Sequence, residues 1–277
     1  MPVDWYNGGM EHTTLHLLYS RFWHLFLHDL GLVSAPEPYQ KRTSHGMILG
    51  ENGEKMSKSR GNVINPDDVI KDIGADAFRL YEMFMGAFDQ AIPWSTNGAK
   101  GCRKFLDRVW RLQEMVTDEK GFSERLNGLM NETIKKVSED YEKMKYNTAI
   151  AAMMTLVNEM YDVGSVTRSE LEALLLILSP VAPHICEEIW QNLGHKEPIH
   201  HQKWPVWDEE ALKKQQVEIA IQINGKVKGR IMIPADLTRE TAMTELPGNP
   251  DVIRLVNGRE IAKIVFVPGR LLNIVVK

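Results

Sequence analysis

Cysteine is scarce: the 277 residues hold two, Cys102 and Cys186, and no Cys-x-x-Cys pair. This scarcity excludes a disulfide framework and a cysteine-based zinc site, and it favours a reducing compartment. Long apolar runs are also missing, since none reaches the length of a membrane-spanning helix, and no signal-peptide pattern is present. We therefore predict a cytoplasmic protein with no membrane partner.

An excess of one charge is missing as well. The chain carries 33 Lys and Arg against 37 Asp and Glu, for a net charge of −4, so no global positive charge indicates a nucleic-acid partner. The balance is uneven, because residues 217–277 hold nine basic and six acidic side chains. The length of 277 residues is enough for one large or two to three small domains, and a hydrophobic content of 43% is enough for a real core.

The most informative stretch is a basic loop at residues 54–62, Glu-Lys-Met-Ser-Lys-Ser-Arg-Gly-Asn. Its lysines, Lys55 and Lys58, are three residues apart with Ser57 between them. Asn65 and Pro66 follow as the expected N-cap and first residue of a helix. Ammonium and hydroxyl groups donate to phosphate oxygens, and a helix N-terminus favours anions. The loop therefore predicts a polyphosphate site, although a solvated basic turn would have the same composition.

The first thirty residues predict a strand, a glycine turn and a helix. Residues 3–6 form the strand, 7–9 the turn and 11–29 the helix, in which apolar residues recur at three and four. This order is typical of the carboxyl edge of a parallel sheet, where nucleotides bind. His12 and His16 are four apart and are expected on one helix face. They lack the further ligands of a zinc site, and no other set of residues has metal-ligand spacing.

Residues 98–193 carry helical periodicity throughout. The pattern predicts an up-and-down bundle of four or five helices whose methionines fill the core. Within it, Ser169–Glu172 predicts a capping box at a helix start.

The tail predicts a small α+β domain. Residues 217–223 and 226–233 alternate around Asn224-Gly225, the strongest short indication of a hairpin. A helical stretch over 238–257 and strands at 261–267 and 271–276 follow. The alternation places Val227, Ile231 and Ile233 towards the core. It places Lys226, Lys228 and Arg230 together on the outer face, either as a phosphate-binding surface or as a solvated strand.

Three sequence motifs in the chain resemble those of one family, the leucyl-tRNA synthetases among the class I aminoacyl-tRNA synthetases. Residues 55–59 are the KMSKS signature of the class. Residues 6–16, Tyr-x-Gly-Gly-x-Glu-His-x-x-x-His, resemble the leucyl form rather than the isoleucyl or valyl form. Residues 222–229, Gln-x-Asn-Gly-Lys-Val-x-Gly, resemble the C-terminal tRNA-binding domain of the bacterial type. The resemblance covers the chain from first residue to last.

The resemblance implies a multi-domain fold. Residues 1–96 would be the C-terminal part of an α/β Rossmann-like catalytic domain. Residues 97–214 would be a helical domain of the anticodon-binding type with a linker. Residues 215–277 would be the small α+β tRNA-binding domain.

The resemblance also implies roles for single residues. Lys55 and Lys58 would be catalytic, and the tRNA would be contacted by Lys226, Lys228 and Arg230. The leucine side chain would lie against Tyr6, His12 and His16. ATP would be bound by Gly8, Gly9, Glu11, Met47, Ile48, Lys55, Ser57 and Lys58. We expect Mg²⁺ to be held mainly by ATP, with no metal site on the protein.

A second class I signature, His-x-Gly-His, is absent from these residues, as is the family's editing domain. The expected function is ATP-dependent activation of leucine and its transfer to tRNA-Leu, carried out by a C-terminal portion or subunit that needs an N-terminal half. The alternative is a non-catalytic tRNA-binding module derived from the synthetase.

Overall fold

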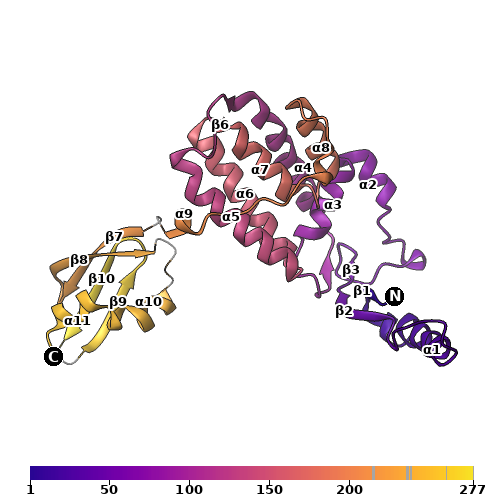
Figure 1. The fold of residues 1–277 in the computed structure, drawn as a ribbon, viewed down its shortest axis with the longest axis horizontal. Coiled ribbons are helices and arrows are strands. Elements are labelled where there is room, and N and C mark those ends of the chain that lie inside the picture. Colours follow the sequence, from indigo (N-terminus) through magenta and orange to yellow (C-terminus); the bar gives the residue numbers. More distant parts are fainter. Residues whose placement is uncertain (214–215, 235–236, 238, 260, 277) are drawn as a thin grey trace. The chain divides into compact units, whose positions relative to one another are not determined.

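The computed structural model describes residues 1–213, 216–234, 237, 239–259 and 261–276. The chain divides into two compact units, Met1–Trp207 and Asp208–Lys277, and each is described by itself (Figure 1). The predicted division at residues 96 and 97 lies within the first unit. The predicted boundary at residues 214 and 215 lies outside the described residues.

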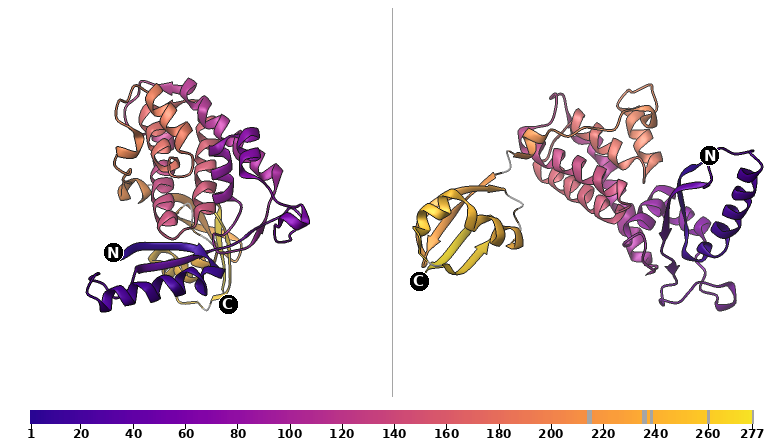
Figure 2. Two further views of the ribbon diagram at one scale, coloured as in Figure 1. Left: turned by 90° about the vertical axis from the view of Figure 1, so that its right-hand side faces the viewer. Right: turned by 60° about the horizontal axis from the view of Figure 1, so that its bottom comes forward.

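The first unit begins with a parallel strand pair. β1 (Val3–Gly9) lies beside β2 (Tyr39–His45), and α1 (His16–Asp29) connects them after a 3-10 turn, η1 (Met10–Thr13). Two further short strands, β3 (Ile48–Leu49) and β4 (Ile92–Pro93), also pair in parallel. Figure 2 shows α1 beside the β1–β2 pair.

Two sequence expectations about this region are wrong. The predicted turn at residues 7–9 is strand, because Gly8 and Gly9 pair with Ser44 and His45 in the parallel ladder. The predicted helix over 11–29 begins at His16, because η1 occupies the residues before it. His12 and His16 therefore lie on different elements.

Helices fill the rest of the first unit. The loop after β3 contains η2 (Lys58–Arg60), and α2 (Pro66–Ile73) and α3 (Ala75–Phe84) follow it. Asn65 accepts a hydrogen bond from the Asp67 N–H at 3.2 Å as the N-cap of α2, as predicted. The bundle consists of α4 (Thr96–Arg111), α5 (Glu124–Glu142), α6 (Tyr146–Val163), α7 (Arg168–Leu178) and α8 (Pro183–Asn192), which confirms the predicted helical bundle.

Short elements join the bundle helices. They are η3 (Leu112–Met115), the parallel pair β5 (Val116–Thr117) and β6 (Val166–Thr167), and η4 (Ile199–His201). The core runs continuously from α3 through the bundle. Met130, Met153 and Met160 are fully buried in it, which confirms that the methionines fill the core.

The capping box of α7 lies two residues before its predicted place. Thr167 is the N-cap and Glu170 is the third helical residue, and each side chain bonds the other's backbone N–H. Both Thr-x-x-Glu at 167–170 and Ser-x-x-Glu at 169–172 match the pattern. The pairing of β6 with β5 ends at Thr167, which sets the helix start at the first of them.

The second unit is a four-stranded sheet in the order β8-β7-β10-β9. Its strands are β7 (Gln216–Ile223), β8 (Lys226–Pro234), β9 (Ile261–Val267) and β10 (Leu271–Val276). Its helices are α9 (Glu209–Lys213), α10 (Arg239–Glu245), η5 (Leu246–Gly248) and α11 (Pro250–Val256). Asn224 and Gly225 have φ values of 49° and 78°, which confirms the predicted hairpin turn. The predicted helix start at residue 238 lies outside the described residues.

The predicted alternation along β8 is wrong near the hairpin. The register shifts between Ile221 and Gln222, so that Gly229 pairs with Ile221 but Val227 pairs with Gln222. Because β8 has one extra residue at this point, the β8 side chains on the hairpin side of it point to the opposite face of the sheet from the one predicted. Val227 is consequently 58% exposed rather than in the core.

The same bulge separates the predicted basic face. Lys226 pairs with the buried Ile223, whereas Arg230 pairs with Ala220. Since paired residues share a face of a sheet, Lys226 and Arg230 lie on opposite faces. Arg230 also forms an ion pair with Glu218 at 2.8 Å.

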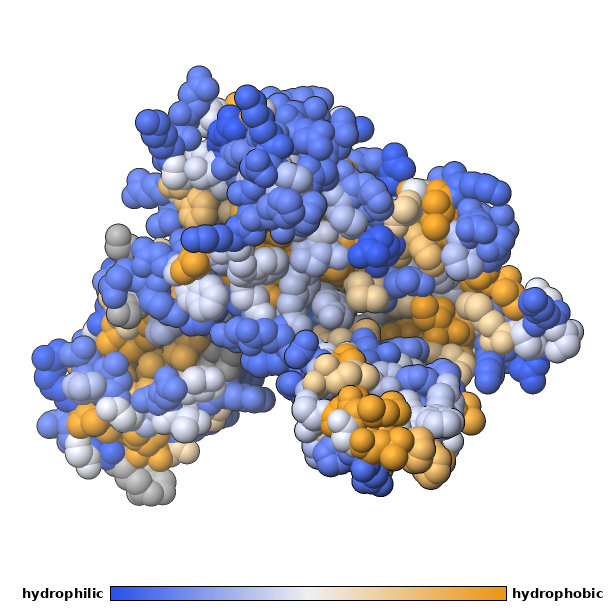
Figure 3. All heavy atoms as spheres, turned by 45° about the vertical axis from the view of Figure 1, so that its right-hand side comes forward, coloured by the Kyte–Doolittle hydropathy of each residue, from blue (hydrophilic) through white to orange (hydrophobic). Residues whose placement is uncertain are grey.

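One surface of the first unit is unusually apolar. Five side chains of the α1 segment, which we call the α1 apolar face, are 47–70% exposed: Leu15, Leu18, Phe22, Trp23 and Phe26. Figure 3 shows apolar side chains gathered at the bottom centre of the view, over this part of the first unit. Contiguous exposed apolar patches are typical of surfaces that bind another chain, a membrane or a ligand.

Candidate active site

The carboxyl ends of β1 and β2 meet at one edge of the parallel pair. The register sets Gly8 opposite Ser44 and Gly9 opposite His45. The segments that follow the two strands therefore leave the sheet side by side. The segment after β1 carries His12 and His16, and the segment after β2 carries Met47 and Ile48. This edge is where ligands bind in parallel α/β sheets.

An aromatic cluster lies at this edge. The Tyr6 hydroxyl and His16 Nδ1 are hydrogen-bonded at 2.7 Å. The Tyr6 ring stacks on Tyr39 at 4.4 Å between centroids, and His12 meets His16 edge-on at 6.5 Å. Burial, followed by the neighbouring Tyr39, raises the pKa of Tyr6, so the phenol stays protonated at neutral pH. The structure thus brings Tyr6, His12 and His16 together, although not on one helix.

The two glycines leave room beside this cluster. A Cβ atom at Gly8 would lie 3.6 Å from the Tyr6 hydroxyl, and a Cβ at Gly9 would lie 2.4 Å from a carboxylate oxygen of Glu11. The first contact is ordinary, but the second is a clash. Gly9 therefore allows the Glu11 carboxylate to lie over the strand end, where it can accept hydrogen bonds from a ligand.

Arg42, which the sequence patterns did not single out, lies at the same edge. Its guanidinium donates to Ser44 Oγ at 2.7 Å and to the Gly9 carbonyl at 3.3 Å. Its Nε is buried and has no hydrogen-bond partner among the residues described. A pattern of side-chain types could not reveal this arrangement, because the contact with Gly9 joins residues 33 apart.

Met47 and Ile48 line a cavity of about 290 Å³ together with Asn7 and Glu82. Gly46 allows its own segment to lie close to the backbone of Gln90, because a Cβ at Gly46 would be 1.8 Å from the Gln90 carbonyl oxygen. Burial raises the pKa of Glu82.

The basic loop is folded on itself. The Gly50 N–H donates to the Glu54 carbonyl at 2.8 Å, and an isolated bridge joins Leu49 to Lys55. Arg60 pairs with Glu54 at 3.2 Å. Lys55 and Lys58 are exposed, and neither ammonium forms an ion pair or hydrogen bond with another described residue.

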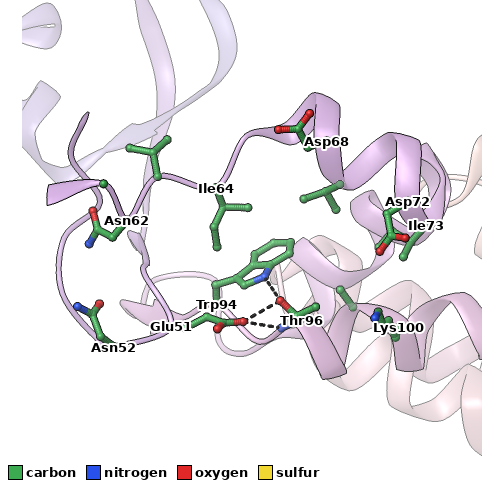
Figure 4. A pocket seen from close by; sticks show the side chains of 14 residues that line it. Glu51, Asn52, Asn62, Ile64, Asp68, Asp72, Ile73, Trp94, Thr96 and Lys100 are labelled. Atoms are coloured by element: carbon green, nitrogen blue, oxygen red, sulfur yellow. Dashed lines mark hydrogen bonds between the residues drawn. The ribbon is translucent and has the colours of Figure 1, made fainter. Parts of the chain in front are cut away.

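A larger cavity of about 570 Å³ lies beside this loop, between it and the start of α4. In Figure 4, Asn62 and Asn52 lie on its loop side, and Glu51 reaches Thr96. The Glu51 carboxylate accepts from Thr96 Oγ1 at 2.7 Å and from the Thr96 N–H at 3.3 Å. These hydrogen bonds lower the pKa of Glu51, and they fix the base of the loop to the N-terminus of α4. Neither Lys55 nor Lys58 lines this cavity.

Two further findings concern metals and membranes. Among the residues described, no group of three or more His, Cys, Asp or Glu could hold a metal ion. In the same part of the chain, no helix is both long enough and apolar enough to cross a bilayer. Cys102 and Cys186 are buried and free.

Comparisons with known proteins agree with these features. The family model for class I tRNA synthetases of the I, L, M and V types matches residues 5–95, and the anticodon-binding domain of tRNA ligase matches residues 125–243. The chain is 58% identical over all 277 residues to the leucine--tRNA ligase of Alkaliphilus oremlandii (strain OhILAs), of which it covers 34%.

Solved structures give the same result. A ternary complex of an Agrobacterium radiobacter K84 LeuRS with tRNA and LeuAMS matches the whole chain, with a TM-score of 0.76, 33% identity and 38% of that chain covered. The Mycobacterium tuberculosis methionyl-tRNA synthetase matches 70% of the chain and 45% of its own, with a TM-score of 0.55 and 20% identity, which shows a shared fold alone. The chain thus spans about a third of its leucyl relatives.

The chain is a homologue of the class I aminoacyl-tRNA synthetases, with matches to their catalytic-type segment and to an anticodon-binding domain. Within that class it is a homologue of leucine--tRNA ligase along its entire length.

Proposed function

We propose that this chain supplies part of a leucine--tRNA ligase, which activates leucine with ATP and transfers it to tRNA-Leu in the cytoplasm. The proposal rests mainly on the exposure of the two loop lysines and on their lack of an ion-pair partner among the described residues. Lys55 and Lys58 are exposed and unpaired among the described residues, while the neighbouring Arg60 is paired with Glu54. Free ammoniums on a folded loop suit a polyphosphate ligand.

The first step is attack of the leucine carboxylate on the α-phosphorus of ATP. The bond to pyrophosphate breaks, and negative charge grows on the departing oxygens. Lys55 and Lys58 stabilise this charge, with Ser57 as a further donor, so catalysis consists mainly of positioning and charge stabilisation. Mg²⁺, held mainly by ATP, would supply further positive charge at the phosphate oxygens.

The strand edge binds the other reactants. Tyr6, His12 and His16 contact the leucine side chain, and the hydrogen bond between Tyr6 and His16 holds both rings in place. Gly8, Gly9 and Glu11 face the adenosine, with the Glu11 carboxylate accepting from ribose hydroxyls. Met47 and Ile48 contact the adenine through their backbone.

In the second step, a hydroxyl of the terminal adenosine of the tRNA takes the leucyl group from the leucyl-adenylate formed in the first step, and AMP leaves. Lys226, Lys228 and Arg230 contact tRNA phosphates from the second unit. Because Arg230 is paired with Glu218, we expect Lys226 and Lys228 to carry more of this contact.

The chain acts with an N-terminal half that bears the His-x-Gly-His signature. The α1 apolar face and the two-stranded parallel pair support this need, since both expose surfaces that are buried in a complete α/β domain.

The test is leucine-dependent ATP–pyrophosphate exchange, by the chain alone and mixed with a His-x-Gly-His-bearing half. We expect exchange only in the mixture. Lys58→Ala is expected to lower it about 100-fold, the scale of losing one preorganised charge donor. Arg60→Ala, which removes a cation already paired with Glu54, is the matched control and should have a smaller effect. An inactive mixture would refute the proposal.

The match of an anticodon-binding domain over residues 125–243 favours one alternative, a non-catalytic tRNA-binding module. Filter binding of tRNA-Leu by the chain alone at two salt concentrations tests it. Salt-sensitive binding, together with an inactive mixture, would support the module.

A further inference from the structure

Asn62 lies at the end of the basic loop and bonds back to it. Gly61, with φ of 65°, reverses the chain in the left-handed region that glycine adopts easily. The Asn62 side chain then accepts from the Ser57 N–H at 2.9 Å and donates to the Lys55 carbonyl at 3.3 Å. One amide group therefore holds two backbone positions, one on either side of Met56.

Gly50 provides the space for this amide. Gly50 is buried, and a Cβ there would lie 3.1 Å from Asn62 Nδ2 and 3.0 Å from Asn52 Oδ1. Both distances are tighter than ordinary contact, so any side chain at Gly50 would push Asn62 away. Figure 4 shows Asn62 and Asn52 on the same side of the adjoining cavity.

The backbone of both lysines depends on these contacts. Lys55 is fixed from one side by its bridge to Leu49 and from the other by Asn62. Lys58 follows directly after Ser57, whose N–H is bonded to Asn62, and its carbonyl accepts from the Gly61 N–H at 3.2 Å. The two side chains nevertheless remain exposed. The backbone is therefore ordered, and only the ammonium groups remain to be ordered by a ligand.

We propose that Asn62 is a positioning residue, which fixes the spacing of Lys55 and Lys58 so that both ammoniums can bind one polyphosphate. This inference rests on the proposed function for its ligand, ATP or pyrophosphate. Asn62 itself touches neither, and it acts through the loop backbone. Preorganisation of this kind lowers the entropy lost when the ligand binds.

The first experiment measures backbone order in the chain alone. Hydrogen exchange of the Ser57 amide should become at least about fivefold faster in Asn62→Ala, the scale of losing one hydrogen bond. Trypsin should also cleave faster after Lys55 and Lys58. Asn62→Asp keeps an oxygen acceptor, so the Ser57 amide should retain its protection.

The matched control is Asn52→Ala. Asn52 Oδ1 accepts from the Glu54 N–H at 3.2 Å, which is the same kind of bond in the same loop, but it does not touch the segment between the lysines. The Ser57 amide should exchange at the wild-type rate in this variant. Unchanged exchange in Asn62→Ala would overturn the proposal.

The second experiment uses the mixture with the N-terminal half. Asn62→Ala should raise KM for ATP about tenfold and lower kcat, and leave KM for leucine unchanged. Gly50→Ala should act in the same direction, because it displaces Asn62 without altering it. A wild-type KM for ATP in Asn62→Ala would also overturn the proposal. An inactive wild-type mixture would count against the proposed function alone, and the Ser57 exchange would then still decide the role of Asn62.

Discussion

Gly46 and Gly101 differ in what surrounds them. A Cβ at Gly46 would meet the Gln90 carbonyl oxygen at 1.8 Å, whereas a Cβ at Gly101, within α4, meets nothing within 4 Å. Gly46→Ala should therefore lower the free energy of unfolding by about 1–3 kcal/mol, the usual scale of overpacking. Gly101→Ala should be neutral or raise it by up to about 1 kcal/mol. Urea unfolding of both variants measures this, and equal stabilities would contradict the geometry.

Glu82 makes stability depend on pH. Burial raises its pKa in the folded state, so above the unfolded-state pKa the folded protein binds more protons than the unfolded chain. The free energy of unfolding then falls as pH rises from the unfolded-state pKa to the folded-state pKa. At higher pH it stays lower by the same amount, because the buried carboxylate is charged. Glu82→Gln should therefore be more stable than wild type at about pH 7, and this gain should vanish at about pH 3, where both states are protonated. Thermal unfolding across this range checks the sign, and a loss of stability at pH 7 would refute it.

The sequence could predict only roles that lie in a residue's own side chain, and these roles stay predictions. Two sequence motifs were enough to predict the family: the one that contains Lys55 and Lys58, and the one that runs from Tyr6 to His16. Asn62 and Arg42 could not be found in this way. Asn62 reaches Ser57 and Lys55 only because the chain reverses at Gly61, and Arg42 reaches the Gly9 carbonyl only because β1 and β2 pair across 33 residues.

At the scale of elements, the start of α7 is fixed by a buried carboxylate. Glu170 is fully buried and accepts from the Ser123 N–H at 2.7 Å, Ser123 Oγ at 2.6 Å and the Thr167 N–H at 2.8 Å. It therefore caps α7 and joins it to the start of α5. Glu170→Ala leaves three donors without their acceptor.

We expect Glu170→Ala to lower the free energy of unfolding by about 3 kcal/mol, since each buried unsatisfied group costs about 1–3 kcal/mol. Chemical denaturation followed by circular dichroism measures the loss. Ser169→Ala is the control, because Ser169 is the N-cap that the sequence pattern predicted and the structure does not use. It should change stability by less than about 0.5 kcal/mol. A larger loss for Ser169→Ala than for Glu170→Ala would restore the sequence-based assignment.

Element types were easier to predict than element ends. The helical bundle and the Asn224-Gly225 hairpin follow from local periodicity and turn chemistry. The end of β1 and the facing of β8 do not, because each depends on a partner strand. Gly8 and Gly9 are extended only because β2 pairs with them, and Val227 is exposed only because of the shift opposite Gln222.

At the scale of the whole molecule, the first unit exposes apolar surface that its own residues do not cover. On the α1 apolar face, Leu18 is 65% and Phe22 is 70% exposed. They are four residues apart and so share a helix face. If this face packs against the N-terminal half, one charge at its centre will oppose association without disturbing the core of the chain.

Phe22→Glu should therefore leave the melting temperature of the isolated chain unchanged, because exposed substitutions alter stability by less than about 0.5 kcal/mol. It should weaken assembly with the N-terminal half at least about tenfold, or about 1.4 kcal/mol. The assembly constant comes from titrating one half against the other while following pyrophosphate exchange. Val206→Glu is the matched control, since Val206 is 85% exposed but lies away from α1 in the sequence. If both variants assembled like wild type, the N-terminal half would have to dock elsewhere on the first unit. If both weakened assembly equally, the effect would reflect added negative charge rather than loss of an apolar contact.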